Sequence, residues 1–172
     1  MCYSIRLSLD NLILFCERGY YMNIIVDGDA CPVISEVIDC AQYRNCVVTI
    51  VRSYHHYTTS EYPSFVTIKY VDDGPDAVDF EIVKNSLMHD IVITQDYGLA
   101  SLLLNKNVIV VHHTGLIIDH DNIDRLLIQR YESAKVRRQH QKSRIKGPKK
   151  LTTQDKNMFK KKLLQIIERY EH

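Results

Sequence analysis

Acidic residues follow two apolar runs at the points where buried strands are predicted to end. Asp27 and Asp29 follow the run 23–26, and Asp96 follows the predicted strand 90–94. In an open parallel sheet, functional groups lie at the carboxyl ends of strands, near the point where the strand order reverses. Neighbouring strands lie about 4.8 Å apart, so carboxylates at their ends converge. The pattern therefore predicts an acidic crevice.

Two further acids, Asp76 and Asp79, stand at the start of a predicted helix over 76–87, on one helical face. Carboxylates that share a crevice repel each other and must take up a proton or a cation. Oxygen ligands favour Mg²⁺ or Mn²⁺ over zinc, and such ions promote phosphodiester hydrolysis. We predict Asp27, Asp79 and Asp96 as catalytic metal ligands, with Asp29 and Asp76 in support. Helix capping is the alternative for Asp76.

The elements that would position these acids alternate between strands and helices. Apolar runs predict strands over 23–26, 46–51, 65–71, 90–94 and 108–111. Amphipathic stretches between them predict helices, the first of which begins at Pro32. This alternation indicates an α/β fold in three layers, with a parallel sheet of about five strands. Two C-terminal helices follow, and the last is capped by Thr152 and Asp155.

The net charge of +1 hides an uneven distribution. Residues 1–124 hold 17 acidic and 7 basic residues, whereas residues 125–172 hold 15 basic and 4 acidic ones. The stretch 135–150 contains eight bases and no acid, which indicates either a phosphate-binding arm or an exposed connector. The bases predicted to bind nucleic acid are Arg137, Arg138, Lys142, Arg144, Lys146, Lys149 and Lys150.

A second group of candidate nucleic-acid-binding residues follows the predicted strand 46–51. Arg52 and His55 stand there among tyrosines, a mixture that can hold phosphates and stack bases. An ordinary surface loop is the alternative. Near the predicted acids, Thr94 can hydrogen-bond an acid or a water, and Cys31 is either a reactive thiol or a packing residue.

Composition also limits the compartment. Five cysteines without a CxxC pair favour free thiols in a reducing cytoplasm. No apolar run reaches the roughly 18 residues that span a bilayer, and no membrane partner is expected. We expect Met22 to be the true start. The predicted division is a non-native extension over 1–21, an α/β domain over 22–134, a basic connector over 135–150 and a C-terminal helix over 151–172 that packs on the domain.

Four motifs together resemble the bacterial YaiI/YqxD family. They are Val26-Asp27-Gly28-Asp29-Ala30-Cys31-Pro32-Val33, Asp76-Ala77-Val78-Asp79, Ile93-Thr94-Gln95-Asp96 and a tail with Gly147-Pro148, Leu151-Thr152 and Asp155-Lys156. Members of this largely uncharacterised family resemble PIN-like domains, whose relatives are metal-dependent ribonucleases. The resemblance implies a PIN-like (Rossmannoid) fold, and it matches Asp27, Asp76, Asp79 and Asp96 to the acidic positions. Gly28 stands where alanine is usual, and Phe80 where a polar residue is common.

The leading hypothesis is therefore a metal-dependent nuclease-like protein that acts on RNA or another phosphodiester. One alternative is a non-catalytic RNA- or ribosome-binding protein that kept the fold. Another is a haloacid-dehalogenase-like phosphatase, because Asp27-Gly28-Asp29 ends a strand. That chemistry usually has threonine or valine where Cys31 stands, and no clear acid pair follows downstream.

Overall fold

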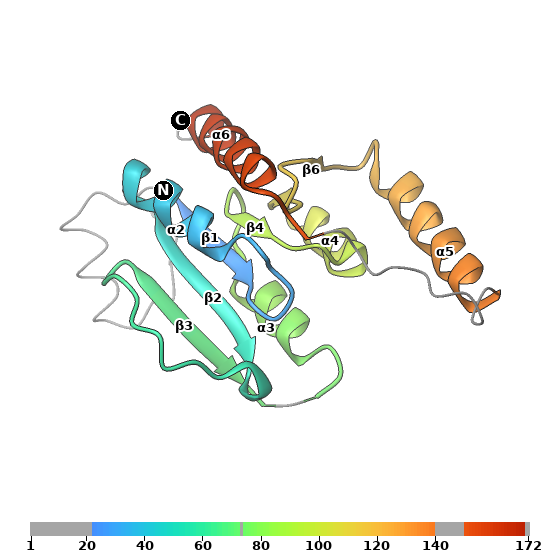
Figure 1. Cartoon of the computed structure of the whole chain (residues 1–172), viewed down its shortest axis with the longest axis horizontal. Helices are drawn as coiled ribbons and strands as arrows, with labels where there is room; N and C mark the ends of the chain where they lie inside the picture. The colour runs from blue at the N-terminus through green and yellow to red at the C-terminus, as the bar shows by residue number, and fades with distance from the viewer. Residues whose placement is uncertain (1–21, 73, 140–149, 171–172) are drawn as a thin grey trace.

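The computed structural model describes residues 22–72, 74–139 and 150–170 (Figure 1). Its strands are β1 (Asn23–Asp27), β2 (Val47–Ser53), β3 (Val66–Val71), β4 (Ile91–Ile93), β5 (Ile109–Val111) and β6 (Ile117–Ile118). Its helices are α2 (Ile34–Arg44), the short 3-10 helix η1 (Tyr54–His56), α3 (Ala77–Asn85), α4 (Tyr97–Leu104), α5 (Ile123–Gln139) and α6 (Thr153–Tyr170).

The strands form one sheet in the order β3-β2-β1-β4-β5-β6. All neighbouring pairs are parallel except β5 and β6, which are antiparallel. From β1 the chain first builds outward through β2 and β3, and then returns to place β4 on the other side of β1. The strand order therefore reverses between β1 and β4, so the carboxyl ends of these two strands flank the position where ligands bind in such sheets.

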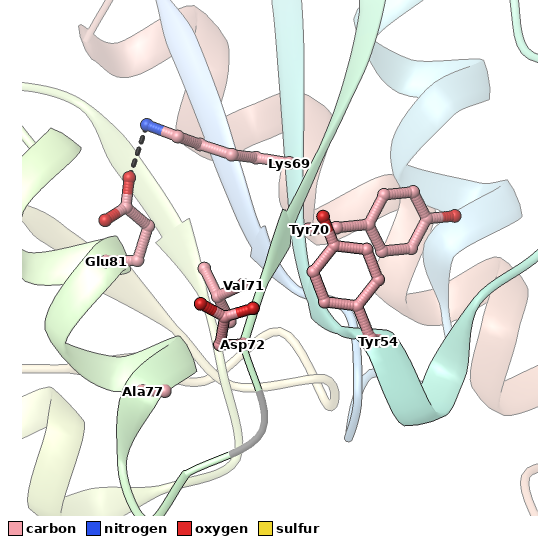
Figure 2. Close-up of a pocket in the computed structure, with 7 residues that line it drawn as sticks. All are labelled: Tyr54, Lys69, Tyr70, Val71, Asp72, Ala77 and Glu81. Atoms are coloured by element: carbon pink, nitrogen blue, oxygen red, sulfur yellow. Dashed lines mark ion pairs between the residues drawn. The ribbon is translucent and has the colours of Figure 1, made fainter.

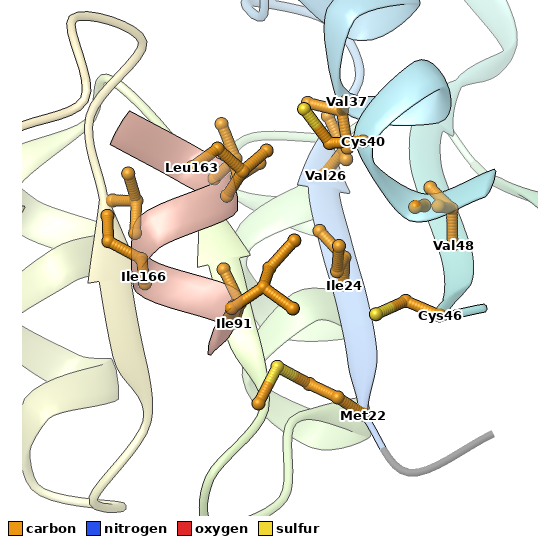
Figure 3. Close-up of a cluster of buried hydrophobic side chains, with 14 of the residues drawn as sticks. Met22, Ile24, Val26, Val37, Cys40, Cys46, Val48, Ile91, Leu163 and Ile166 are labelled. Atoms are coloured by element: carbon orange, nitrogen blue, oxygen red, sulfur yellow. The ribbon is translucent and has the colours of Figure 1, made fainter. Parts of the chain in front are cut away.

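Hydrophobic residues cover both faces of the sheet, which explains the continuous apolar runs in its central strands. On one face, α2 and α6 pack against a core that includes Ile24, Val48, Ile91 and Leu163 (Figure 3). On the other face, α3, α4 and α5 pack against a second core, which includes Ile25 and Val92. Because neighbouring strand residues point to opposite faces, adjacent isoleucines of β1 belong to different cores.

The predicted α/β class and its three layers are confirmed, and the structure adds details at the edges. The sheet has a sixth, two-residue strand, β6, beyond the five predicted. The capping interaction of α6 is confirmed, because Asp155 N donates to Thr152 Oγ1 at 3.2 Å and Thr152 N donates to Asp155 Oδ2 at 2.8 Å. Helix α5 continues to Gln139, five residues into the stretch predicted as a connector.

Parts of the predicted organisation lie outside the described residues. These parts are the extension 1–21 and most of the basic stretch, residues 140–149. Phe159 and Leu163 of the last helix, α6, are fully buried in the core that this helix shares with α2. None of the helices described here is both long and apolar enough to cross a membrane.

Candidate functional site at the carboxyl ends of β1 and β4

Asp27 is the last residue of β1, and only 5% of its surface is exposed. The hydroxyl of Thr94, directly after β4, donates a hydrogen bond of 2.9 Å to Asp27 Oδ2. Burial raises the pKa of Asp27; the Thr94 hydrogen bond opposes this rise, and the charges of Asp29 and Asp96 add to it. A carboxyl group in this setting favours a proton or a nearby cation over an uncompensated negative charge.

Asp96 lies beside the same hydroxyl, because its backbone N–H donates to Thr94 Oγ1 at 3.0 Å. Its side chain caps α4 by accepting hydrogen bonds from Gly98 N at 2.6 Å and Leu99 N at 3.3 Å. Two guanidinium nitrogens of Arg130 reach its two carboxylate oxygens, at 3.1 and 3.2 Å. Burial alone would raise the pKa of Asp96, but Arg130 and the cap hold it below its usual value.

Asp79 lies in the first turn of α3, where the negative charges of the other acids act on it. Burial and, after it, the negative charges of Asp27, Asp96 and Asp76 raise the pKa of Asp79 to about 6. Arg130 opposes this rise. Asp79 therefore lies within electrostatic reach of the two acids that follow β1 and β4.

Asp76 immediately precedes α3 in an unusual backbone conformation. Its φ is +59°, in the left-handed region that aspartate tolerates better than most residues. Within the described chain its side chain accepts no hydrogen bond from the first turn of α3, so it does not act as the helix cap that sequence reasoning left open. Its carboxylate is exposed beside Asp79 and contributes to the raised pKa of that residue.

Asp29 connects the loop after β1 to the end of β2. Both of its carboxylate oxygens accept the backbone N–H of Ser53, at 3.1 and 3.2 Å. Nδ1 of His56 lies 3.1 Å from the same carboxylate. These contacts hold η1 against the loop that follows β1. Asp29 thus positions a neighbouring loop, whereas the sequence suggested a supporting metal ligand.

The donor chemistry of Asp27, Asp79 and Asp96 fits a hard divalent cation, because all three supply carboxylate oxygen. Their mutual effects on pKa show that they share one electrostatic environment. Across the described ranges 22–72, 74–139 and 150–170, however, no three His, Cys, Asp or Glu side chains are placed to hold a metal ion together. The acids fit the cation in chemistry, and closer approach of their side chains is needed to ligate it.

Arg52 crosses the loop after β1 because Gly28 has no side chain there. A Cβ atom on Gly28 would lie 2.5 Å from Arg52 Cγ and 2.6 Å from Ile50 Cγ2, closer than packing allows. Nε of Arg52 is buried and has no hydrogen-bond partner within the described chain. His55, the other candidate of this loop, is exposed in η1. The guanidinium of Arg52 therefore lies next to the loop that carries Asp27 and Asp29.

The basic candidates of the C-terminal half are only partly described. Arg137 and Arg138 lie near the end of α5, and Arg138 is exposed. Lys150 is exposed just before α6. The other candidates, Lys142, Arg144, Lys146 and Lys149, lie outside the described residues. Helix α5 thus runs from the layer beside α4 into the basic stretch (Figure 1).

Cys31 is a partly buried residue of the loop after β1 that packs against the core. Burial raises its pKa to about 12, and the negative charges of Asp27 and Glu36 add to the rise. A thiol with such a pKa stays protonated at neutral pH and is a poor nucleophile. Cys31 packs against the core between the sheet and α2, which favours the packing role over the reactive one.

Comparison with known proteins identifies the family. The model of one family, described as "Uncharacterized BCR, YaiI/YqxD family", matches residues 25–169. The chain belongs to the YaiI/YqxD family.

Individual members of the YaiI/YqxD family are close in sequence. A UPF0178 protein of Staphylococcus aureus strain MRSA252 is 52% identical over 147 residues, which cover 86% of this chain and 95% of the relative. UPF0178 proteins of the bovine strain RF122 / ET3-1 and of strain Newman are 51% and 50% identical over the same shares. No solved structure matches the chain. The names of these relatives assign no activity, so chemistry must be argued from the site.

Sequence reasoning missed Arg130, the cation that contacts Asp96. A signal was nevertheless present, because Arg130 continues the helical face of Ile123 and Leu126, both buried in the core beneath α5. Arg130 is half exposed, so it lies at the margin of this face, where a basic side chain can pair with an acid of the neighbouring helix. Recognising that pattern predicts a partner for Arg130, although the identity of Asp96 depends on how α5 packs on α4.

Proposed function

We propose that this protein is a nuclease-like enzyme with a PIN-like fold, which hydrolyses RNA or another phosphodiester with the help of Mg²⁺ or Mn²⁺. The observation that carries the proposal is the bridge through Thr94. One hydroxyl contacts Asp27 and the backbone of Asp96, at the ends of two neighbouring parallel strands. This geometry holds two acids at the position where the strand order reverses, which is where open α/β sheets bind ligands.

Asp27, Asp79 and Asp96 would hold the cation, and the electrostatic coupling among them supports this assignment. Asp27 and Asp79 lie in environments where added positive charge offsets burial and the repulsion of neighbouring acids. A divalent cation bound there supplies Lewis acidity and lowers the pKa of a bound water. Thr94 orients Asp27, and Arg52 supplies positive charge for a phosphate group of the substrate.

The haloacid-dehalogenase-like alternative requires a second acid that is available to transfer a proton at the substrate. Asp29 would be that residue, but both of its oxygens accept the Ser53 N–H and one lies against His56. This geometry favours the nuclease-like proposal over the phosphatase. The non-catalytic RNA-binding alternative is distinguished by experiment.

The test uses the purified full chain with single-stranded RNA in Mn²⁺ or in EDTA. We expect cleavage in Mn²⁺ and none in EDTA. Asp27→Asn and Asp79→Asn should weaken Mn²⁺ binding by at least the tenfold to hundredfold that loss of an outer-shell partner costs. Asp124→Asn, at an exposed acid of α5, is the matched control and should retain binding and cleavage.

Cleavage that persists in EDTA, or that is equal in wild type and Asp27→Asn, would exclude the proposed site. Binding of RNA without cleavage in Mn²⁺ would favour the non-catalytic alternative. Release of inorganic phosphate from a simple monoester, with RNA left intact, would favour the phosphatase.

A further inference from the structure

Three tyrosines gather where β2 and β3 end. The rings of Tyr54 and Tyr70 stack with centroids 5.6 Å apart and an interplanar angle of 19°. The ring of Tyr57 lies 5.2 Å from that of Tyr70, tilted by 37°. Tyr54 and Tyr57 are 53% and 65% exposed, so much of this aromatic surface faces solvent. We call Tyr54, Tyr57 and Tyr70 the tyrosine platform.

The platform is held in place by polar contacts at its base. The hydroxyl of Tyr70 accepts from Thr58 N at 3.2 Å and donates to Thr58 O at 3.3 Å, which fixes the segment after η1. At the other end of η1, Asp29 holds Ser53. The exposed rings of Tyr54 and Tyr57 are therefore presented by an anchored loop, and little order remains to be gained when a ligand binds.

A cation lies between the platform and the acidic residues. Arg52 of β2 is paired in register with Tyr70 of β3, and residues paired in this way in a parallel sheet project from the same face. On its other side Arg52 crosses Gly28, the residue that directly follows Asp27. Arg52 as a whole is partly exposed, whereas its Nε is buried and has no hydrogen-bond partner within the described chain.

A cavity of about 400 Å³ opens beside the platform, at the carboxyl end of β3 (Figure 2). Tyr54 and Tyr70 line it together with Lys69 and Glu81, which form an ion pair between β3 and α3. Val71 and Ala77 contribute apolar surface. The volume lies within the range of about 300–1,000 Å³ that is typical of sites for small organic ligands, a class that includes nucleosides. Asp79 lies on the same helix, two residues after Ala77 and two before Glu81.

We propose that the tyrosine platform binds the unpaired bases of a single-stranded nucleic acid, with the neighbouring phosphate on Arg52. Aromatic rings beside a cation are the elements with which proteins hold single strands without reading their sequence. A duplex keeps its bases stacked on each other, so it offers no free base face to Tyr54 and Tyr57. The proposal rests on the proposed function in one respect, since it names the substrate class of the same site.

The path of the bound nucleic acid across the surface follows from the order of these groups. Bases lie over Tyr57 and Tyr54, whose rings are supported by Tyr70 at the outer edge of the sheet, and the next phosphate meets Arg52. The chain then continues across Gly28 toward Asp27 at the end of β1. The platform thereby places a phosphodiester next to the acids without contributing to the chemical step.

The experiment measures binding of a labelled short single strand by fluorescence anisotropy in EDTA, where no metal contributes. The same sequence is tested as RNA, as DNA and as the matching duplex. We expect the single strands to bind more tightly than the duplex. Tyr54→Ala and Tyr57→Ala should each weaken binding about tenfold, whereas Tyr54→Phe, which keeps the ring, should bind like wild type.

Tyr43→Ala is the matched control. Tyr43 is 74% exposed and its ring lies 5.7 Å from the guanidinium of Arg44, but it belongs to α2. It should retain full binding. Arg52→Met, which keeps the packed stem, should weaken binding and reduce its dependence on salt, because one phosphate contact is lost. Circular dichroism of each variant checks that the fold is retained.

Equal binding by wild type and the folded Tyr54→Ala and Tyr57→Ala variants would overturn the inference, as would a duplex that binds as tightly as the single strand. Equal loss in Tyr43→Ala would overturn it as well. The proposed function fails separately. If binding depends on the tyrosines but no metal-dependent cleavage occurs, the platform proposal stands and the nuclease proposal fails. If metal-dependent cleavage occurs but the tyrosine variants bind and cleave like wild type, the nuclease proposal stands and the platform proposal fails. Asp27→Asn should bind the strand at least as tightly as wild type, since it removes a negative charge.

Discussion

Arg130 and Asp96 face each other with two parallel contacts, Nη1 to Oδ1 at 3.1 Å and Nη2 to Oδ2 at 3.2 Å. This bidentate geometry is the strongest form of ion pair between these groups. It ties α5 to the N-terminus of α4 and places a positive charge beside the acids of the candidate site. In the proposed enzyme, Arg130 therefore neutralises part of the negative charge of Asp96 and so competes with a divalent cation for it.

Removal of Arg130 should strengthen binding of a divalent cation. Arg130→Gln keeps a polar side chain of similar length but removes the competing charge on Asp96. Because both side chains are substantially exposed, the pair contributes at most about 1 kcal/mol, so the Mn²⁺ affinity should rise up to about fivefold. Isothermal titration calorimetry measures this change. Arg125→Gln, at an exposed base of the same helix, serves as control. Weaker Mn²⁺ binding in Arg130→Gln would show that Arg130 positions Asp96 instead of competing for it.

Asp79 should titrate near pH 6 in the folded protein, because burial and the neighbouring acids raise its pKa to about 6. The raised pKa means that the folded state binds this proton more tightly than the unfolded state, in which the pKa is near 3.8. The contribution of Asp79 to the free energy of unfolding therefore falls as the pH rises from about 4 to about 6, and it is lowest above that range. NMR titration of the carboxyl carbon reports the pKa directly.

The same effect appears as a difference in thermal stability. Asp79→Asn removes the titrating group, so the melting temperature of the variant relative to wild type should increase between pH 4 and pH 6 and then level off. Asp124→Asn should show no such change. A relative melting temperature of Asp79→Asn that falls with rising pH in this range would contradict the raised pKa.

Much of the fold could be predicted because its central strands are buried on both faces. Such strands require continuous apolar runs, and the runs around Ile24 and Val92 are visible without knowledge of the sheet. Strand β6 was not predicted, since two residues, Ile117–Ile118, carry no periodic signal. Their place is set by pairing with β5, and such pairing across a turn depends on backbone hydrogen bonds that side-chain types do not reveal.

The acids of the candidate site were found by their position after strands, since chain order places Asp27 and Asp96 at strand ends. The partners of those acids depend on three-dimensional packing. Asp29 holds Ser53, 24 residues further along, and Arg130 reaches Asp96 across 34 residues. Contacts between such distant residues follow from how helices and loops pack, so local spacing could not assign these roles.

Phe159 should be essential for stability, although it lies on the last helix. Its side chain is fully buried between α6 and the sheet, together with Leu163 and Ile167. Phe159→Ala should lower the free energy of unfolding by about 3–5 kcal/mol, because it removes buried surface and leaves a cavity. Urea denaturation followed by circular dichroism measures the loss. Met158→Ala, at an exposed neighbour on α6, should change stability little. A small effect of Phe159→Ala would contradict the close packing of α6 on the domain.

Thr94 should control the ionisation of Asp27. Its hydrogen bond lowers the pKa of Asp27 against the stronger effect of burial, so Thr94→Val, which has the same shape without the hydroxyl, should raise that pKa further. It also leaves Asp96 N without its acceptor, and the two losses together should cost about 1–3 kcal/mol of stability. If ionised Asp27 binds the cation, the pH midpoint of Mn²⁺ binding should move upward in Thr94→Val. Thr94→Ser, which keeps the hydroxyl, should restore the wild-type midpoint. An unchanged midpoint in a folded Thr94→Val protein would show that Asp27 does not contribute to cation binding.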